Sequence, residues 1–138
     1  KKIIKKINKF NGCILALDYG YAQKNNKETL QSIKKHKYTD PLLNVGTSDI
    51  SSHVNFELIS SVLKKNNLEV KKIVTQSEFL QKIGIIERAN ILSKKMSFKQ
   101  KANMFFRIKK LLNPKDMGNI FKVLFAQKKG NDFSLGFK

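Results

Sequence analysis

The residues that follow the first apolar run of the chain are its first candidates for chemistry. The run Cys13-Ile14-Leu15-Ala16-Leu17 is followed by Asp18-Tyr19-Gly20-Tyr21, which places one carboxylate and two phenol groups beside a glycine. A short, continuous apolar run predicts a strand buried on both faces, as in a parallel sheet covered by helices. Because ligands of such sheets bind outside the carboxyl ends of the strands, we expect these four residues to border a binding crevice.

Each of the four residues also has a structural interpretation. Asp18 either lines the ligand pocket or caps the next turn. Tyr19 and Tyr21 either stack on a ligand or border the core, and Gly20 permits a tight turn.

The two histidines, His36 and His53, lie in or directly after a long polar stretch, residues 22–52. A histidine and a carboxylate can act as a general base that accepts a proton from a substrate, so His36, Asp49 and His53 are the candidate catalytic residues. The same groups can instead brace the loop with hydrogen bonds. For Asp49 we favour bracing, as the cap of a helix that begins near residue 51. Without a recognised ligand spacing, two histidines and one aspartate do not predict a metal site.

Three predicted strands, with helices before and between them, position these side chains. Apolar and β-branched runs predict strands over residues 13–18, 68–75 and 120–126. Helical spacing of apolar residues predicts helices over residues 1–10, 54–66, 76–83 and 85–112. Thr75 or Ser77 is expected to cap the third helix, and a capping box at Ser97 is expected to break the fourth. Gln76 follows a strand end, where it either contacts substrate or is an N-terminal helix residue.

Other parts of the chain predict less regular structure. The polar stretch of residues 22–52 is long for a loop, and we expect a short helix near residues 28–35 to interrupt it. The tail, residues 128–138, is rich in glycine and lysine and is expected to fray. Three strands do not complete a two-sided sheet, and an unpaired apolar edge favours aggregation. We therefore expect part of the sheet to be missing, with the first helix entered midway inside a fold.

The positive charge of the chain is large but spread out. The formal net charge is +18, and only Arg88 and Arg107 are arginines. Since arginine makes most specific phosphate and guanine contacts, we favour a lysine-rich surface, of the kind an AT-rich coding sequence produces, over a specific nucleic-acid site. A nucleic-acid-binding module would cluster lysines with exposed aromatic rings, whereas burial of Phe105, Phe106 and Phe121 would count against it.

The single cysteine, Cys13, excludes an intrachain disulfide and a CxxC zinc motif. Its place in an apolar run predicts a buried structural thiol. No apolar run has the length of a membrane span.

Four stretches, in this order and at these spacings, together resemble the MidA family of S-adenosylmethionine-dependent methyltransferases. They are Leu15 to Tyr21; Glu28 to Gln31 with His36 and Asp40 to Leu42; Gly46 to Phe56; and Thr75-Gln76, Phe79-Leu80 and Gly84-Ile85 with Met117-Gly118 and Phe121 to Leu124. The resemblance covers nearly the whole chain. Ser51 departs from the usual threonine and Asn55 from the common aspartate, which puts in doubt any role that needs a charge at position 55.

The resemblance implies an α/β fold, the C-terminal portion of a Rossmann-like class I methyltransferase sheet. The last three strands would be present, with the final strand antiparallel between the other two. Residues 1–127 would be the C-terminal part of the methyltransferase domain, residues 22–53 a loop insertion on the active-site side, and residues 128–138 a basic tail. Asp18, Tyr19 and Gly20 would lie on the cofactor side of the site, and Tyr21 and Gln76 on the substrate side.

S-adenosylmethionine is the cofactor that the resemblance implies for the intact protein. Donor binding in such folds needs a glycine-rich turn after the first strand and an acidic residue after the second. The seven glycines of this chain stand singly and no G-x-G occurs. We therefore expect no donor binding by this chain alone, and activity only with the missing N-terminal part of the same enzyme as its partner.

The implied function is protein (arginine) N-methylation linked to respiratory complex I assembly. Its partner would be a protein substrate, for instance a complex I subunit, with no specific nucleic acid and no membrane span. The location would be the cytoplasm of a bacterium or the mitochondrial matrix of a eukaryote. Two alternatives remain, a basic nucleic-acid-binding module and a non-functional remnant.

Overall fold

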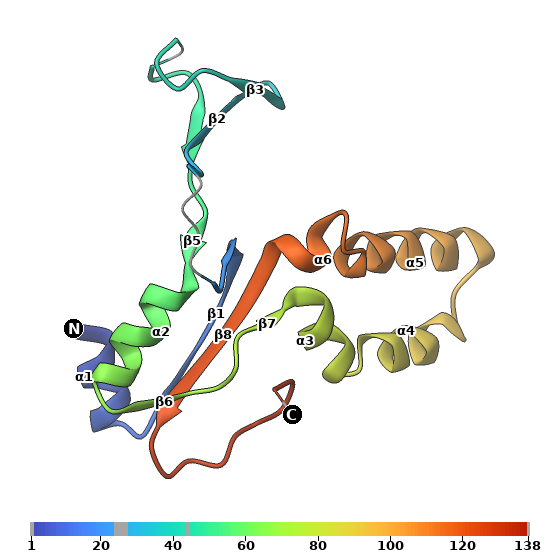
Figure 1. Cartoon of the computed structure of the whole chain (residues 1–138). Helices are drawn as coiled ribbons and strands as arrows, with labels where there is room; N and C mark the ends of the chain where they lie inside the picture. The colour runs from blue at the N-terminus through green and yellow to red at the C-terminus, as the bar shows by residue number, and fades with distance from the viewer. Residues whose placement is uncertain (1, 24–27, 44, 138) are drawn as a thin grey trace.

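A computed structural model describes residues 2–23, 28–43 and 45–137 of the chain (Figure 1). The helices are α1 (Lys2–Lys9), α2 (Phe56–Lys65), α3 (Gln76–Lys82), α4 (Ile85–Ser93), α5 (Phe98–Leu112) and α6 (Met117–Ile120). The strands are β1 (Cys13–Tyr21), β2 (Gln31–Lys34), β3 (Lys37–Thr39), β4 (Asp49–Ser51), β5 (Val54–Asn55), β6 (Leu68–Val70), β7 (Val74–Thr75) and β8 (Phe121–Lys128).

The main sheet is mixed and is organised around the last strand. Its order is β5-β1-β8-β6, and β7 also pairs with β8. Strand β8 runs antiparallel to β1, β6 and β7, whereas β5 runs parallel to β1. The expected antiparallel insertion of the final strand between the other two is therefore confirmed. The predicted strand over residues 68–75 is two short strands, β6 and β7.

One face of the sheet is covered by α1 and α2 (Figure 1). Their apolar side chains, with Leu124 and Ala126 of β8, form the principal core; the buried members from the helices and β6 are Ile4, Ile7, Phe56, Leu63 and Leu68. Ile14 and Ala16 of β1 pack against this core. As the helical spacing of their apolar residues predicts, α1 and α2 each bury one apolar stripe.

The opposite face of β8 is covered by α3 and the C-terminal tail. The Phe125 ring lies 5.1 Å from the Phe133 ring and 5.5 Å from the Phe137 ring, measured between centroids. Phe137 also contacts Phe79 of α3, at 5.3 Å. The expectation that the tail frays is wrong, because its aromatic side chains complete the packing over β8.

The same face of β1 is uncovered. Residues directly opposite on paired strands share a face, so Leu15, paired with Phe125, and Leu17, paired with Val123, lie on the side of the tail. The tail does not reach them, and Leu15 and Leu17 are 53% and 44% exposed. Cys13 is exposed on this face as well. The predictions of a strand buried on both faces and of a buried thiol are therefore wrong for the described part of the chain.

A small antiparallel sheet, β3-β2-β4, forms an arm that projects from the main body (Figure 1). The short helix predicted near residues 28–35 is therefore wrong. Lys34 pairs with Lys37, and the two residues between them have left-handed backbones, with φ of 48° at Lys35 and 62° at His36. Two consecutive positive φ angles are the geometry of a type I′ hairpin turn. Lysine and histidine are uncommon there, which is why the sequence did not reveal the turn.

The predicted helix caps are observed for α3 and α5 but not for α2. Ser97 forms the predicted capping box with Gln100, and of the two expected caps of α3, Thr75 is the one observed, in a capping box with Glu78. Helix α2, in contrast, begins at Phe56, and its cap is Asn55, whose side-chain oxygen accepts a hydrogen bond from the Leu58 amide at 3.0 Å. The predicted cap by Asp49 is therefore wrong.

Candidate functional site

The candidate site lies where the carboxyl ends of β1 and β7 meet the first residues of β8. Lys122 of β8 pairs with Asp18 of β1 on one side and with Thr75 of β7 on the other. The sheet thus brings residues far apart in sequence to one edge. This is the edge at which ligands of open α/β sheets bind.

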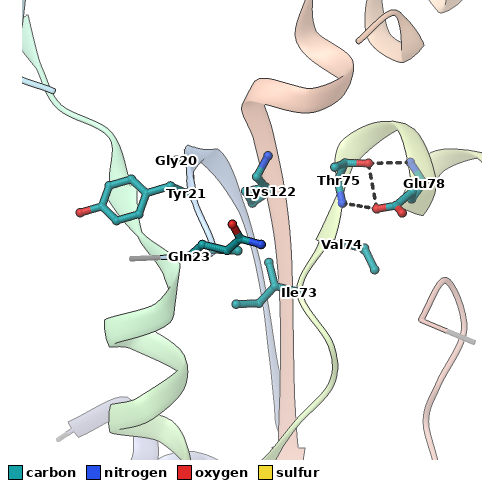
Figure 2. A pocket seen from close by; sticks show the side chains of 9 residues that line it. Gly20, Tyr21, Gln23, Ile73, Val74, Thr75, Glu78 and Lys122 are labelled. Carbon is teal, nitrogen blue, oxygen red and sulfur yellow. Dashed lines mark hydrogen bonds between the residues drawn. The ribbon is translucent and has the colours of Figure 1, made fainter. Parts of the chain in front are cut away.

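A hollow of about 360 Å³ opens at this edge (Figure 2). It is lined by Gly20, Tyr21, Ala22, Gln23, Ile73, Val74, Thr75, Glu78 and Lys122. Tyr21 and Gln23 come from the end of β1 and the segment after it, and Thr75 and Glu78 from the start of α3, with Lys122 between the two groups. The Tyr21 ring extends away from Thr75 and Glu78. The hollow is within the size range of small-molecule sites.

The charged groups of the hollow are held by their neighbours. One Glu78 oxygen accepts hydrogen bonds from the Thr75 amide at 2.8 Å and the Thr75 hydroxyl at 3.0 Å. These hydrogen bonds lower the pKa of Glu78. Burial lowers the pKa of Lys122, an effect that the nearby Glu78 charge partly opposes. The Lys122 ammonium donates to the Asn119 carbonyl.

Glycine is required at position 20 because the backbones of β1 and β5 approach each other closely there. Gly20 lies within strand β1, not in the predicted tight turn. It pairs with Val54 of β5. A Cβ atom at this position would lie 2.2 Å from the Val54 carbonyl oxygen and 3.0 Å from the Phe56 ring. Only glycine therefore allows β5 and the start of α2 to pack against the end of β1.

Tyr19 and His53 are brought together at the end of β1. Their rings meet edge to face with centroids 5.7 Å apart, and Tyr19 meets Phe121 in the same way at 5.8 Å. The His53 amide donates to the Thr29 hydroxyl at 3.3 Å. Asp18 is exposed, and its carboxylate accepts a hydrogen bond from the neighbouring Tyr19 amide at 2.8 Å. The structure thus brings His53 to Tyr19, whereas Asp18, Gly20 and Tyr21 adjoin Tyr19 as its neighbours along β1.

Three other predicted site residues lie elsewhere. His36 is exposed in the β2–β3 turn of the arm, and Asp49 is exposed in β4, where it pairs with Ile33. Gln76 is buried as the first residue of α3, and its amide donates to the Leu111 carbonyl at 2.9 Å. For Gln76 the structural alternative is therefore the one observed.

The two charged residues of the hollow, Glu78 and Lys122, were not predicted from the sequence. Glu78 is visible in sequence as the acidic member of the Thr75 capping box, but nothing local says that it also faces a hollow. Lys122 is one lysine among many, and only its register opposite Asp18 and Thr75 places it at the site.

Within residues 2–23, 28–43 and 45–137, no three His, Cys, Asp or Glu side chains gather closely enough to hold a metal ion. The helices of the described residues also include none with the length and apolar character of a membrane span.

The aromatic residues of α5 are exposed. Burial of Phe105, Phe106 and Phe121 would count against a nucleic-acid module, yet Phe106 is 70% exposed, Phe105 is exposed as well, and Phe121 is only half-buried. Burial of these rings therefore does not count against that alternative, and the surface of α4 and α5 needs an explanation of its own.

Comparison with known proteins identifies the family. Residues 1–74 match the sequence model described as "Putative S-adenosyl-L-methionine-dependent methyltransferase". Over 123 residues, 88% of this chain, the sequence is 30% identical to the mitochondrial protein arginine methyltransferase NDUFAF7 of Xenopus tropicalis. Over 87 residues, 63% of this chain, it is 32% identical to the NDUFAF7 homolog of Caenorhabditis elegans.

The fold is similar to that of a Burkholderia thailandensis protein whose crystal structure contains S-adenosyl-homocysteine. The TM-score is 0.73 at 24% identity, and the similarity covers 96% of this chain and 37% of that one. The chain spans 28% of the Xenopus relative and 20% of the Caenorhabditis relative. The chain belongs to the MidA family of S-adenosylmethionine-dependent methyltransferases.

Proposed function

We propose that this chain is the C-terminal portion of a Rossmann-like class I methyltransferase domain and works only when joined to the donor-binding portion. It would supply the last three strands of that sheet, β1, β6 with β7, and β8. The antiparallel position of β8 between β1 and β6 supports this assignment. The greater length of the relatives supports it as well.

The observation that carries the proposal is the uncovered side of β1. In the described part of the chain, β1 pairs with β5 only at Gly20 and Tyr21 on the side away from β8. Residues 13–19 therefore present an unpaired strand edge, beside the exposed side chains of Leu15 and Leu17. An apolar edge of this kind invites another strand. We assign it to the strand that would precede β1 in the complete sheet.

The residues of this chain do not fit the methyl donor by themselves. Asp18, Tyr19 and Gly20 border the site, but the Asp18 carboxylate already bonds the Tyr19 amide, and no glycine-rich turn is present. The donor supplies an activated methyl group when it is bound. In the proposal, the rest of the domain holds most of the donor and this chain contributes one wall.

The acceptor side of the site is the part that this chain contributes most fully. Methylation of a nitrogen releases one proton, and a neutral histidine can accept it. His53 is the proposed acceptor of that proton, with Tyr19 orienting its ring. Tyr21 and the hollow beside it would hold the substrate side chain. The arm within residues 22–53 would stand on the active-site side, and residues 128–138 would close the opposite face of β8.

The proposed substrate is a protein arginine, because the relatives are named protein arginine methyltransferases. Linkage to complex I assembly and a complex I subunit as substrate extend the same proposal. If the source is eukaryotic the proposed location is the mitochondrial matrix, as the relatives' names include mitochondrial; in a bacterium it is the cytoplasm.

The test is S-adenosylmethionine binding by calorimetry, for this chain alone and for a chimera. In the chimera, this chain replaces the aligned 28% of the Xenopus relative. We expect no binding by the chain alone and binding by the chimera. Donor binding by the 138 residues alone would contradict the account of a missing donor pocket.

Two matched variants test the proposed β1 interface. Leu15 and Leu17 changed together to Glu should abolish donor binding by the chimera, because the complete domain would cover this face of β1 and charged groups cannot be buried without large cost. Leu58 and Val62 changed together to Glu are the control, since both are similarly exposed but lie on α2. If the two variants bind the donor equally well, β1 is not the interface. If the unmodified chimera folds but binds no donor, the chain is better explained as a non-functional remnant.

A further inference from the structure

The turn between α4 and α5, at the end of a helical hairpin, carries exposed apolar side chains. We call residues 91–99 the hairpin tip. Figure 1 shows it at the end of the hairpin that lies away from the main sheet. Phe98 is 88%, Ile91 61% and Leu92 41% exposed. The hollow described above, which is the proposed active site, does not involve these residues.

The hairpin tip is also strongly basic. It contains Lys94, Lys95 and Lys99 and no acidic residue. The absence of acidic residues extends from Arg88 to Lys115, a stretch with nine basic residues, which are Arg88, Lys94, Lys95, Lys99, Lys101, Arg107, Lys109, Lys110 and Lys115. A charge of one sign over 28 consecutive residues attracts an anionic surface.

We propose that the hairpin tip docks on an anionic phospholipid membrane surface. Lysines around exposed apolar side chains are the arrangement by which peripheral proteins bind such surfaces. The ammonium groups would meet the lipid phosphates. Phe98, Ile91 and Leu92 would enter the boundary between headgroups and acyl chains. This inference does not rest on the proposed methyltransferase function, because it uses a surface on the other side of α3.

The side chains of the hairpin tip favour a membrane over a nucleic acid. Aromatic rings can stack on unpaired bases, but Ile91 and Leu92 are aliphatic and have no flat face for stacking. Transfer of either side chain from water to an apolar medium lowers the free energy. The tip also has no arginine, the side chain that binds phosphate in a bidentate manner.

Vesicle co-sedimentation tests the proposal with the 138-residue chain. The probes are vesicles of phosphatidylcholine and vesicles of an equimolar mixture of phosphatidylcholine and phosphatidylglycerol. We expect binding to the mixed vesicles only. Removal of the inserted ring in Phe98→Ser should weaken that binding about tenfold. Phe106→Ser is the matched control, because Phe106 is also an exposed ring on α5 but lies two turns from the tip, and it should bind like the wild type.

Charge reversal separates local docking from diffuse attraction. Lys94 and Lys95 changed together to Glu should weaken binding by about 25-fold or more, from about fivefold for each lysine. Lys64 and Lys65 changed together to Glu alter the net charge equally at the end of α2, and should change binding much less. Equal losses in the two double variants would overturn the proposal in favour of diffuse attraction.

Two further outcomes would overturn the proposal. If Phe98→Ser and Phe106→Ser weaken vesicle binding equally, the tip is not the inserted part. If the chain binds a single-stranded RNA homopolymer but not the mixed vesicles, and Phe98→Ser reduces that binding, the tip is a nucleic-acid site. Circular dichroism of every variant checks that the fold is unchanged.

Discussion

Replacement of Gly20 by alanine tests the packing that forms the candidate site. Gly20 has no positive φ angle, so alanine meets no backbone penalty there, and the effect of the substitution is steric. The added methyl group would stand 2.2 Å from the Val54 carbonyl oxygen. That oxygen belongs to the backbone of β5, which cannot move without separating β5 from β1.

The expected cost is at the upper end of the range for an overpacked site. Overpacking costs about 1–3 kcal/mol, and flexible side chains relieve it most easily. A backbone carbonyl and the buried Phe56 ring leave little room for relief, so we expect Gly20→Ala to lower the free energy of unfolding by about 2–3 kcal/mol. With a urea m-value of about 1.5 kcal/mol/M, the midpoint would fall by about 1.3–2 M.

Urea unfolding followed by circular dichroism measures this change, and Gly12→Ala is the control. Gly12 also has no positive φ, because Asn11 carries the left-handed conformation at the end of α1. An added Cβ at Gly12 meets its nearest atom at 3.7 Å, which is ordinary contact. We expect Gly12→Ala to be neutral or to stabilise by about 0.5 kcal/mol, since it restricts the unfolded chain. A Gly20→Ala midpoint equal to that of Gly12→Ala would refute the close approach of β1 and β5.

Three further predictions concern caps, acid stability and the tail. Asn55→Ala should cost about 1 kcal/mol in thermal unfolding, whereas Asn55→Asp should keep the stability, because the cap needs only an oxygen acceptor; equal losses would contradict the cap. The hydrogen bonds from Thr75 lower the pKa of Glu78 below its usual 4.5, so they stabilise the fold above that pH and this contribution is lost as pH falls through the lowered pKa. Glu78→Gln, which keeps a capping box, should therefore show a smaller fall in melting temperature between pH 7 and pH 3 than the wild type. Phe137→Ala should lower the free energy of unfolding by about 2 kcal/mol and speed amide exchange in β8, because the Phe137 ring packs on Phe79. An unchanged exchange rate would support a frayed tail that does not pack on β8.

The parts of the fold that follow from local chemistry could be predicted from the sequence. The capping boxes at Thr75 and Ser97 each lie within four residues, so nothing distant is needed to recognise them. The apolar composition of β8 likewise identified a strand. Its antiparallel position came from the family resemblance, because no local pattern distinguishes the direction of a strand in a sheet.

The parts that depend on distant partners could not be predicted. Lys35 and His36 adopt a hairpin turn without the glycine or asparagine that usually indicates one. Phe133 and Phe137 are separated in a glycine- and lysine-rich tail, and their role is visible only once β8 supplies Phe125 beneath them. Cys13 has an apolar sequence context but an exposed place in the sheet. For the tail and for Cys13 the packing that decides the structure lies outside any local window, whereas the turn at Lys35 and His36 is local and lacks the residues that usually indicate one.

The same distinction separates the candidate site from its sequence-based prediction. The predicted site residues on β1 are adjacent in sequence and therefore lie together, whereas His36 lies in the arm and His53 lies at the end of β1. Asn55 shows the value of the geometry. Its departure from the usual aspartate left the role of position 55 in doubt, and as a helix cap the position needs an oxygen and no charge.

The three candidate functions differ in what they require of β1. A self-standing nucleic-acid module gains nothing from an unpaired apolar strand, since Leu15 and Leu17 bind no phosphate and expose the chain to aggregation. A remnant tolerates such a strand but gives it no partner. A methyltransferase portion needs it, because a central strand must present apolar side chains on both faces and hydrogen-bonding groups on both edges. The exposure of Leu15 and Leu17 beside an unpaired edge is therefore evidence for a missing neighbour, independent of the family comparison.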